Sequence, residues 1–126
     1  KQINNINENL IRNFSIERLI DSLTILDTNK ILSHIGQCLG RYESLSGKHL
    51  SNRKKAGIYF HVSCLVERLV RQSPIEIYPD LENLQKSQSQ SIKWIQEAFS
   101  TIEEVYSVKI PPAEIGYIYD ILVAED

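Results

Sequence analysis

The chain of 126 residues contains no methionine, two cysteines, four prolines and five glycines. Two cysteines are too few for a scaffold held by disulfides, and they suit the reducing cytoplasm, where we expect this protein to be located. No apolar run approaches the roughly 20 residues that a helix needs to cross a bilayer, so we expect no membrane contact. The sequence begins at Lys1 without a basic and apolar leader, and we expect it to be a domain excised from a longer protein.

Neither sign of charge is in large excess. Lys and Arg together number 14 and Asp and Glu together number 16, which gives a net charge of −2 and a pI of about 5.9. Domains that bind the phosphate backbone through many charges are normally basic. We therefore do not expect this chain to bind DNA, and we assign any DNA contact to other domains of the parent protein.

The apolar residues recur at helical spacing, and no stretch alternates in the manner of a strand. This pattern predicts an all-α fold, a compact bundle of about five helices. The expected helices begin at Ser15, run from Asp27 or Thr28 to about Leu45, run from about Asn52 to Gln72, span the apolar positions from Leu84 to Ile102, and begin at Pro111 and Pro112. In the fourth of these, the polar "QKSQSQS" is expected to be an exposed or irregular start. Glu114 then falls in the first turn of the last helix, where its charge favours the helix dipole. Residues 1–14 are expected to be a polar lead-in or linker, and residues 15–126 a single domain.

The stretch "YFHVSCLVERLV", in the third expected helix, carries a histidine beside its apolar face. The positions that share this face are Ile58, Val62, Leu65, Val66 and Leu69. At about 100° per residue, His61 lies roughly 90° from the centre of the face, on a stripe with Cys64 and Arg68. A neutral imidazole at such a boundary can accept a phosphoryl group, and Arg68 could then bind the phosphate with its forked donors. The alternative, a packed and inert His61, stays open, because most boundary histidines have no chemistry.

The remaining polar residues give weaker indications. Lys48, Arg53, Lys54 and Lys55 gather at the start of the third expected helix, where positive charge opposes the helix dipole. They are a candidate surface for docking an acidic partner or nucleic acid, against the alternative of a solvated polar face. The three histidines and two cysteines are dispersed and lack metal-ligand spacing, and no Gly-rich phosphate loop is present. We therefore expect no metal, no cofactor and no enzymatic activity.

Two motifs together resemble one family. "HVSCLVERL" is similar to the histidine-containing helix of phosphotransferase-system regulation domains, known as PRDs, in which a His followed seven residues later by Arg recurs in an "H-x-x-x-A-I-E-R-L"-like setting. "IPPAEIGYIYDIL" resembles the closing "I-P-x-x-E-I-x-Y-I" helix of the same family. The resemblance extends roughly from Ile16 to Leu122, and it implies a compact five-helix bundle that commonly forms a homodimer.

The resemblance also implies a function. It makes His61 the acceptor of a phosphoryl group from HPr or from a sugar-specific EII component of the phosphotransferase system, and the parent protein a regulator of transcription for sugar use. The added charge of roughly −1.5 to −2 would then alter domain or dimer packing. In two places the sequence departs from PRDs of antiterminators: Phe60 replaces an Asp before the histidine, and "YIYDIL" has Asp120 and no second histidine. The second departure is closer to the PRDs of sigma-54-dependent activators of the levanase-activator type.

Two alternatives from other classes remain. The chain could be a structural helical dimerisation module, in which His61 is inert. It could also be a histidine phosphotransfer domain of two-component signalling, although those domains commonly carry "H-x-x-K-G" and here Val62, Ser63, Cys64 and Leu65 follow the histidine. The donor of the phosphoryl group separates these hypotheses.

Overall fold

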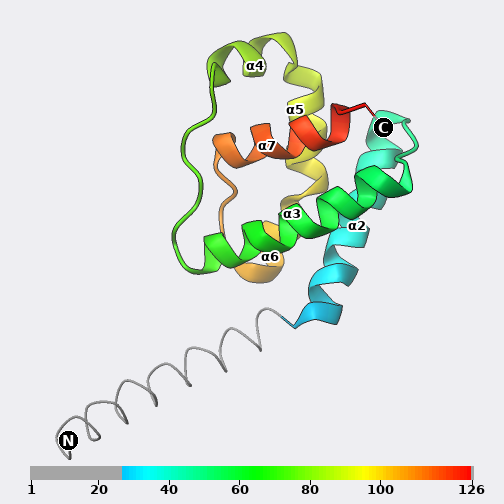
Figure 1. The fold of residues 1–126 in the computed structure, drawn as a ribbon, viewed down its shortest axis with the longest axis vertical. Coiled ribbons are helices and arrows are strands. Elements are labelled where there is room, and N and C mark those ends of the chain that lie inside the picture. The colour runs from blue at the N-terminus through cyan, green and yellow to red at the C-terminus, as the bar shows by residue number, and fades with distance from the viewer. Residues whose placement is uncertain (1–26, 126) are drawn as a thin grey trace, which may run out of the picture.

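The structure, a computed structural model, describes residues 27–125. Within this range the chain forms helices connected by short segments and no strand, so the predicted all-α fold is confirmed (Figure 1). The helices are α2 (Thr28–Ser46), α3 (Asn52–Val70), α4 (Leu81–Ser87), α5 (Ser89–Ala98), α6 (Ser100–Tyr106) and α7 (Pro112–Val123). The helix expected to begin at Ser15, and the polar lead-in at residues 1–14, lie outside the described residues. None of the described helices combines the length and the apolar character that crossing a membrane requires.

The two longest helices begin where the sequence predicts, and they end within two residues of the predicted ends. The side chain of Asp27 accepts a hydrogen bond from the backbone N–H of Lys30 at 3.0 Å and caps α2. Gly47 ends this helix in the left-handed conformation, with φ of 71°, and donates its N–H to the carbonyl of Glu43. Ser51 caps α3 by accepting from the N–H of Lys54 at 3.1 Å. The link between them is short, and α2 and α3 pack against each other.

The prediction of one helix from Leu84 to Ile102 is wrong. This part of the chain forms three helices, α4, α5 and α6, with breaks at Gln88 (φ −124°, ψ 38°) and at Phe99 (φ −94°, ψ 6°). The first break falls in the polar stretch "QKSQSQS", where no apolar side chain requires a continuous helix. The second break turns the chain so that Phe99 and Ile102 are both fully buried. Burial of two large apolar side chains outweighs the hydrogen bonds that a continuous helix would add.

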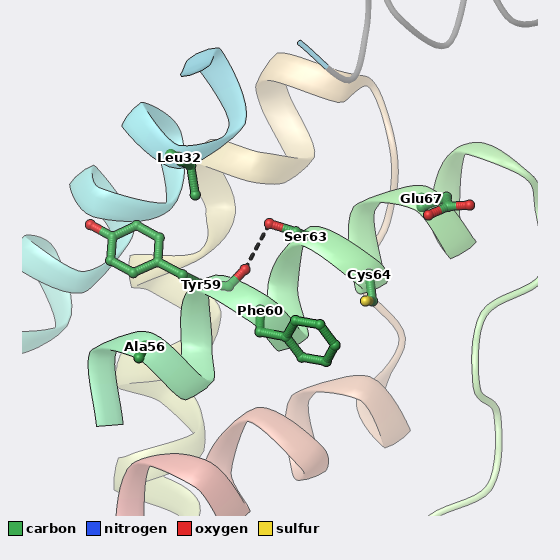
Figure 2. A pocket seen from close by; sticks show the side chains of 7 residues that line it. All are labelled: Leu32, Ala56, Tyr59, Phe60, Ser63, Cys64 and Glu67. Carbon is green, nitrogen blue, oxygen red and sulfur yellow. Dashed lines mark hydrogen bonds between the residues drawn. The ribbon is translucent and has the colours of Figure 1, made fainter. Parts of the chain in front are cut away.

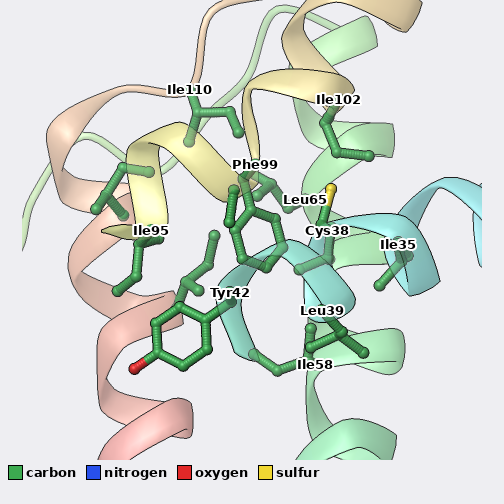
Figure 3. Close-up of a cluster of buried hydrophobic side chains, with 14 of the residues drawn as sticks. Ile35, Cys38, Leu39, Tyr42, Ile58, Leu65, Ile95, Phe99, Ile102 and Ile110 are labelled. Atoms are coloured by element: carbon green, nitrogen blue, oxygen red, sulfur yellow. The ribbon is translucent and has the colours of Figure 1, made fainter. Parts of the chain in front are cut away.

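A single apolar core lies between these helices, and α3 packs against α2 on one side and α7 on the other. All five positions predicted for the apolar face of the third helix are buried. The side chains labelled at the centre of the core in Figure 3 are Ile35, Cys38, Leu39 and Tyr42 of α2, Ile58 and Leu65 of α3, and Ile95, Phe99, Ile102 and Ile110 from the later part of the chain. Because α3 lies between two neighbours, residues at the edges of its apolar face, including His61, are only partly buried.

Candidate functional site

His61 lies on α3 at a partly buried position, as the helical projection predicts. Its Nε2 atom is enclosed and has no hydrogen-bond partner among residues 27–125. Burial lowers the pKa of His61 below its ordinary value, the positive charge of Arg68 lowers it further, and the negative charge of Glu114 opposes both. The ring is therefore neutral near pH 7, which is the nucleophilic form of imidazole.

Arg68, two turns further along α3, forms an ion pair with Glu114 of α7. The guanidinium donates from Nε to Oε2 at 3.0 Å and from Nη2 to Oε1 at 2.8 Å, so both carboxylate oxygens are engaged. The Glu114 side chain is 0% exposed, whereas the Arg68 side chain remains 26% exposed. The hydrogen bonds to Glu114 are the main cause that raises the pKa of Arg68. Two parallel charge-assisted hydrogen bonds fix the guanidinium in orientation as well as in place.

The same carboxylate also binds the segment that connects α3 to α4, residues 71–80. The backbone N–H of Ile75 donates to Oε2 of Glu114 at 2.8 Å. Glu114 thus joins three parts of the chain: the end of α3, the start of α7 and the α3–α4 connection. Figure 1 shows this connection running from the end of α3 past the start of α7 to α4.

Two further contacts hold the α3–α4 connection to α7. The hydroxyl of Tyr117 donates to the carbonyl of Ile77 at 2.9 Å, and the hydroxyl of Tyr78 donates to Oδ1 of Asp120 at 2.6 Å. The Tyr78 and Tyr117 rings meet edge to face, with their centroids 5.0 Å apart. Burial raises the pKa of Tyr78 to about 12, and the hydrogen bond to Asp120 contributes to the rise. Asp120, the residue noted in place of a second histidine, therefore has a structural partner.

The sequence did not predict the pairing of Arg68 with Glu114, although it singled out both residues. Sequence reasoning gave Glu114 a role only in the helix dipole. The available signal was its position among apolar neighbours in "IPPAEIGYI", because an acid on a buried helix face requires a partner. Arg68 lies at the edge of the apolar face of α3, and α3 packs against α7.

The basic cluster is at the opposite end of α3 from Arg68. Thirteen residues separate Lys55 from Arg68, about 20 Å along a helix. Glu43 lies within this cluster: its carboxylate is 3.8 Å from Nζ of Lys55 and 3.2 Å from Nδ1 of His49. Lys48 and Arg53 are exposed, and Lys54 is partly buried. Lys54 lies seven positions before His61 on α3, the same spacing as from His61 to Arg68, so one candidate docking residue shares the His61 stripe, whereas the cluster as a whole lies at the other end of the helix from Arg68.

A shallow groove lies on the outer side of α2 and α3, next to the His61 stripe (Figure 2). Its lining residues are Leu32, Ala56, Tyr59, Phe60, Ser63, Cys64 and Glu67. Phe60 is 75% exposed, and the hydroxyl of Ser63 donates to the carbonyl of Tyr59 at 2.7 Å. Within residues 27–125, no three His, Cys, Asp or Glu side chains are grouped closely enough to bind a metal ion.

Comparison with known proteins gives one family. The model of the PRD domain matches residues 36–125. The chain is 26% identical over 109 residues to the transcriptional regulatory protein DagR of Salmonella typhimurium; the aligned part is 86% of this chain and 12% of that protein. The comparison with solved structures gave no significant match. Since the matched region covers more than half of the chain and includes His61, Arg68 and Glu114, the chain belongs to the PRD family.

Proposed function

We propose that this PRD is a phosphorylation-controlled regulatory domain, and that His61 accepts the phosphoryl group. The observation that carries the proposal is the combination of a neutral, partly buried imidazole with an arginine on the same stripe of α3. Of the three histidines in the sequence, His61 is the one that stands in the family's "H-x-x-x-x-x-E-R-L" spacing, with Glu67, Arg68 and Leu69. Membership of the PRD family supports a regulatory role and no catalytic one.

The proposed reaction transfers a phosphoryl group from a donor side chain to a ring nitrogen of His61. The lone pair of a neutral His61 ring nitrogen attacks phosphorus, the bond from phosphorus to the donor atom breaks, and the donor atom keeps that electron pair. The proton on the second ring nitrogen of His61 is then released to solvent. The donor that the family resemblance suggests is HPr or a sugar-specific EII component. Arg68 would stabilise the transferred group by charge and by hydrogen bonds.

The parent protein is proposed to be a bacterial transcriptional regulator of sugar use. Its relative DagR is named a transcriptional regulatory protein, and this chain spans only 12% of that protein's length. The output therefore belongs to other domains, which would contact DNA, and this domain would act in the cytoplasm as part of a homodimer. The "YIYDIL" ending without a second histidine supports a regulator of the sigma-54-dependent, levanase-activator type.

The test is phosphoryl transfer from phosphoenolpyruvate through Enzyme I and HPr, with and without EIIB, measured by intact mass at neutral pH. We expect one added phosphoryl group on the wild type and on His34→Ala and His49→Ala, and none on His61→Ala. Transfer that persists in His61→Ala would show that another residue accepts the phosphoryl group. No transfer from active components would favour the structural module, and transfer from an aspartyl phosphate of a response regulator would favour the phosphotransfer domain.

A further inference from the structure

Glu114 is the common partner of Arg68 and of a connecting segment. It is fully buried, it accepts two hydrogen bonds from Arg68, and it accepts a third from the N–H of Ile75 in the α3–α4 connection. The state of Arg68 and the position of the connection are thus coupled through one carboxylate. Removing Arg68 from this carboxylate changes the environment of Ile75 as well.

Arg68 is placed to leave Glu114 for a phosphoryl group on His61. The two residues are seven positions apart on one helix face, roughly 10 Å along the axis. Both Arg68 and Glu114 already act electrostatically on the His61 ring, with opposite signs.

We propose, resting on the function proposed above, that a phosphoryl group on His61 competes with Glu114 for Arg68 and thereby releases the part of the α3–α4 connection around Ile75 from α7. The phosphoryl group carries roughly −1.5 to −2 charges, against −1 for Glu114, so it attracts the guanidinium more strongly. The same charge repels Glu114. A carboxylate that stays buried after losing its cation is strongly disfavoured, so Glu114 turns toward solvent and Ile75 loses its acceptor.

The other contacts hold the connection at residues 77 and 78, beyond Ile75. The hydrogen bonds Tyr117–Ile77 and Tyr78–Asp120 are solvent-exposed, and the Ile77 side chain is 79% exposed and buries little apolar surface. Gln72 and Asp80, near its two ends, have φ of 61° and 56°, a conformation that residues other than glycine adopt at a cost. The path of the connection therefore depends on its contacts with α7: Glu114 holds it at Ile75, and Gly116 and Asp120 hold it at Tyr78.

Hydrogen–deuterium exchange of the whole chain tests this coupling. The protein is phosphorylated with potassium phosphoramidate, a small-molecule donor, and in parallel through HPr, and the addition at His61 is verified by mass. We expect the Ile75 amide to exchange about tenfold faster after phosphorylation, because it loses a charged acceptor. Core amides of α2, such as that of Leu39, should be unchanged. His61→Ala, treated with phosphoramidate, should show no change at Ile75.

Variants distinguish the proposed competition for Arg68 from a general loosening of the domain. Arg68→Gln should show fast exchange at Ile75 without phosphate and little further change with it, and Arg68→Lys should be intermediate. Arg71→Gln is the matched control, because Arg71 pairs with Glu67 on the surface of α3 at 2.7 Å; it should respond to phosphorylation as the wild type does. Phosphate on His61 with unchanged exchange at Ile75 would overturn this inference and leave the proposed function standing. No phosphate on His61 from either donor would overturn both, and the wild-type comparison holds even if a variant fails to fold.

Discussion

The ring of Tyr78 occupies the space that a side chain at Gly116 would need. A Cβ atom at position 116 would lie 2.7 Å from Cδ2 of Tyr78, closer than such atoms approach in proteins. Glycine in α7 therefore permits the α3–α4 connection to lie directly on this helix. The Tyr78 ring thus packs directly against the backbone of α7 at Gly116.

Gly116→Ala should therefore destabilise the protein, although alanine is the better helix former. We expect a loss of about 1–3 kcal/mol in the free energy of unfolding, because the Tyr78 ring must be displaced. Gly40→Ala in α2 is the matched control, since nothing lies within 4 Å of its added Cβ; it should gain roughly 0.5–1 kcal/mol from helix propensity. Urea denaturation measures both. Equal gains for the two variants would show that Tyr78 does not constrain position 116.

Glu114→Gln should be strongly destabilising. The change removes the negative charge that holds Arg68 while keeping the size of the side chain, and breaking a buried ion pair costs about 3–5 kcal/mol. Glu67→Gln removes a partner at a similar distance, 2.7 Å from Arg71, but on an exposed surface, and should cost no more than about 0.5 kcal/mol. Chemical denaturation of the two variants under the same conditions provides the comparison. A loss of similar size in both would contradict a special role for the buried pair.

The lowered pKa of His61 makes stability depend on pH. Its folded-state pKa lies below the ordinary value near 6.5, so the unfolded chain binds the proton more readily at mildly acidic pH. The contribution of His61 is fully present above about pH 6.5 and is lost as the pH falls through the folded-state pKa. The free energy of unfolding should fall more steeply in the wild type than in His61→Gln over this window. Parallel curves for the two proteins would be evidence against a desolvated imidazole.

Asp120→Asn should lower the pKa of Tyr78 from about 12 toward the ordinary value near 10. The Asp120 carboxylate accepts a hydrogen bond from the Tyr78 hydroxyl at 2.6 Å, and its negative charge disfavours the tyrosinate. The amide of asparagine lacks that charge. The pKa should remain above the ordinary value, because burial is the larger cause. Ultraviolet absorbance of tyrosinate during an alkaline titration measures the shift, with Tyr78→Phe to identify the transition. An unaltered titration in Asp120→Asn would mean that burial alone sets this pKa.

Local features were predictable from the sequence, and features that depend on distant partners were not. Asp27, Gly47 and Ser51 act within one turn of the helix ends that they define, so their roles follow from short stretches of sequence. The burial of Ile58 and its neighbours on α3 follows from helical periodicity for the same reason. The break at Phe99 instead depends on how the chain must turn to bury its apolar side chains in the common core, which periodicity does not report.

The candidate site divides in the same way. His61 and Arg68 share a stripe on one helix, and that arrangement was visible in a projection of the sequence. Glu114 lies 46 residues beyond Arg68, and the pairing depends on the packing of α7 against α3. The placement of His61 and Arg68 on one stripe was therefore predicted, whereas the carboxylate that holds Arg68 required the structure.

The unequal lengths of the helices have a consequence for the order of folding. Helices α4 and α6 have seven residues each, too short to be stable alone, whereas α2 and α3 have 19 each and are joined by a short turn. We expect the α2–α3 pair to form first, since its contacts are close in sequence, and α7 to arrive after the short helices have assembled. Until α7 packs against α3, the ion pair between Arg68 and Glu114 has not formed, and the side of α3 that carries His61 faces water. A chain still emerging from the ribosome would thus expose His61 more fully than the finished domain does.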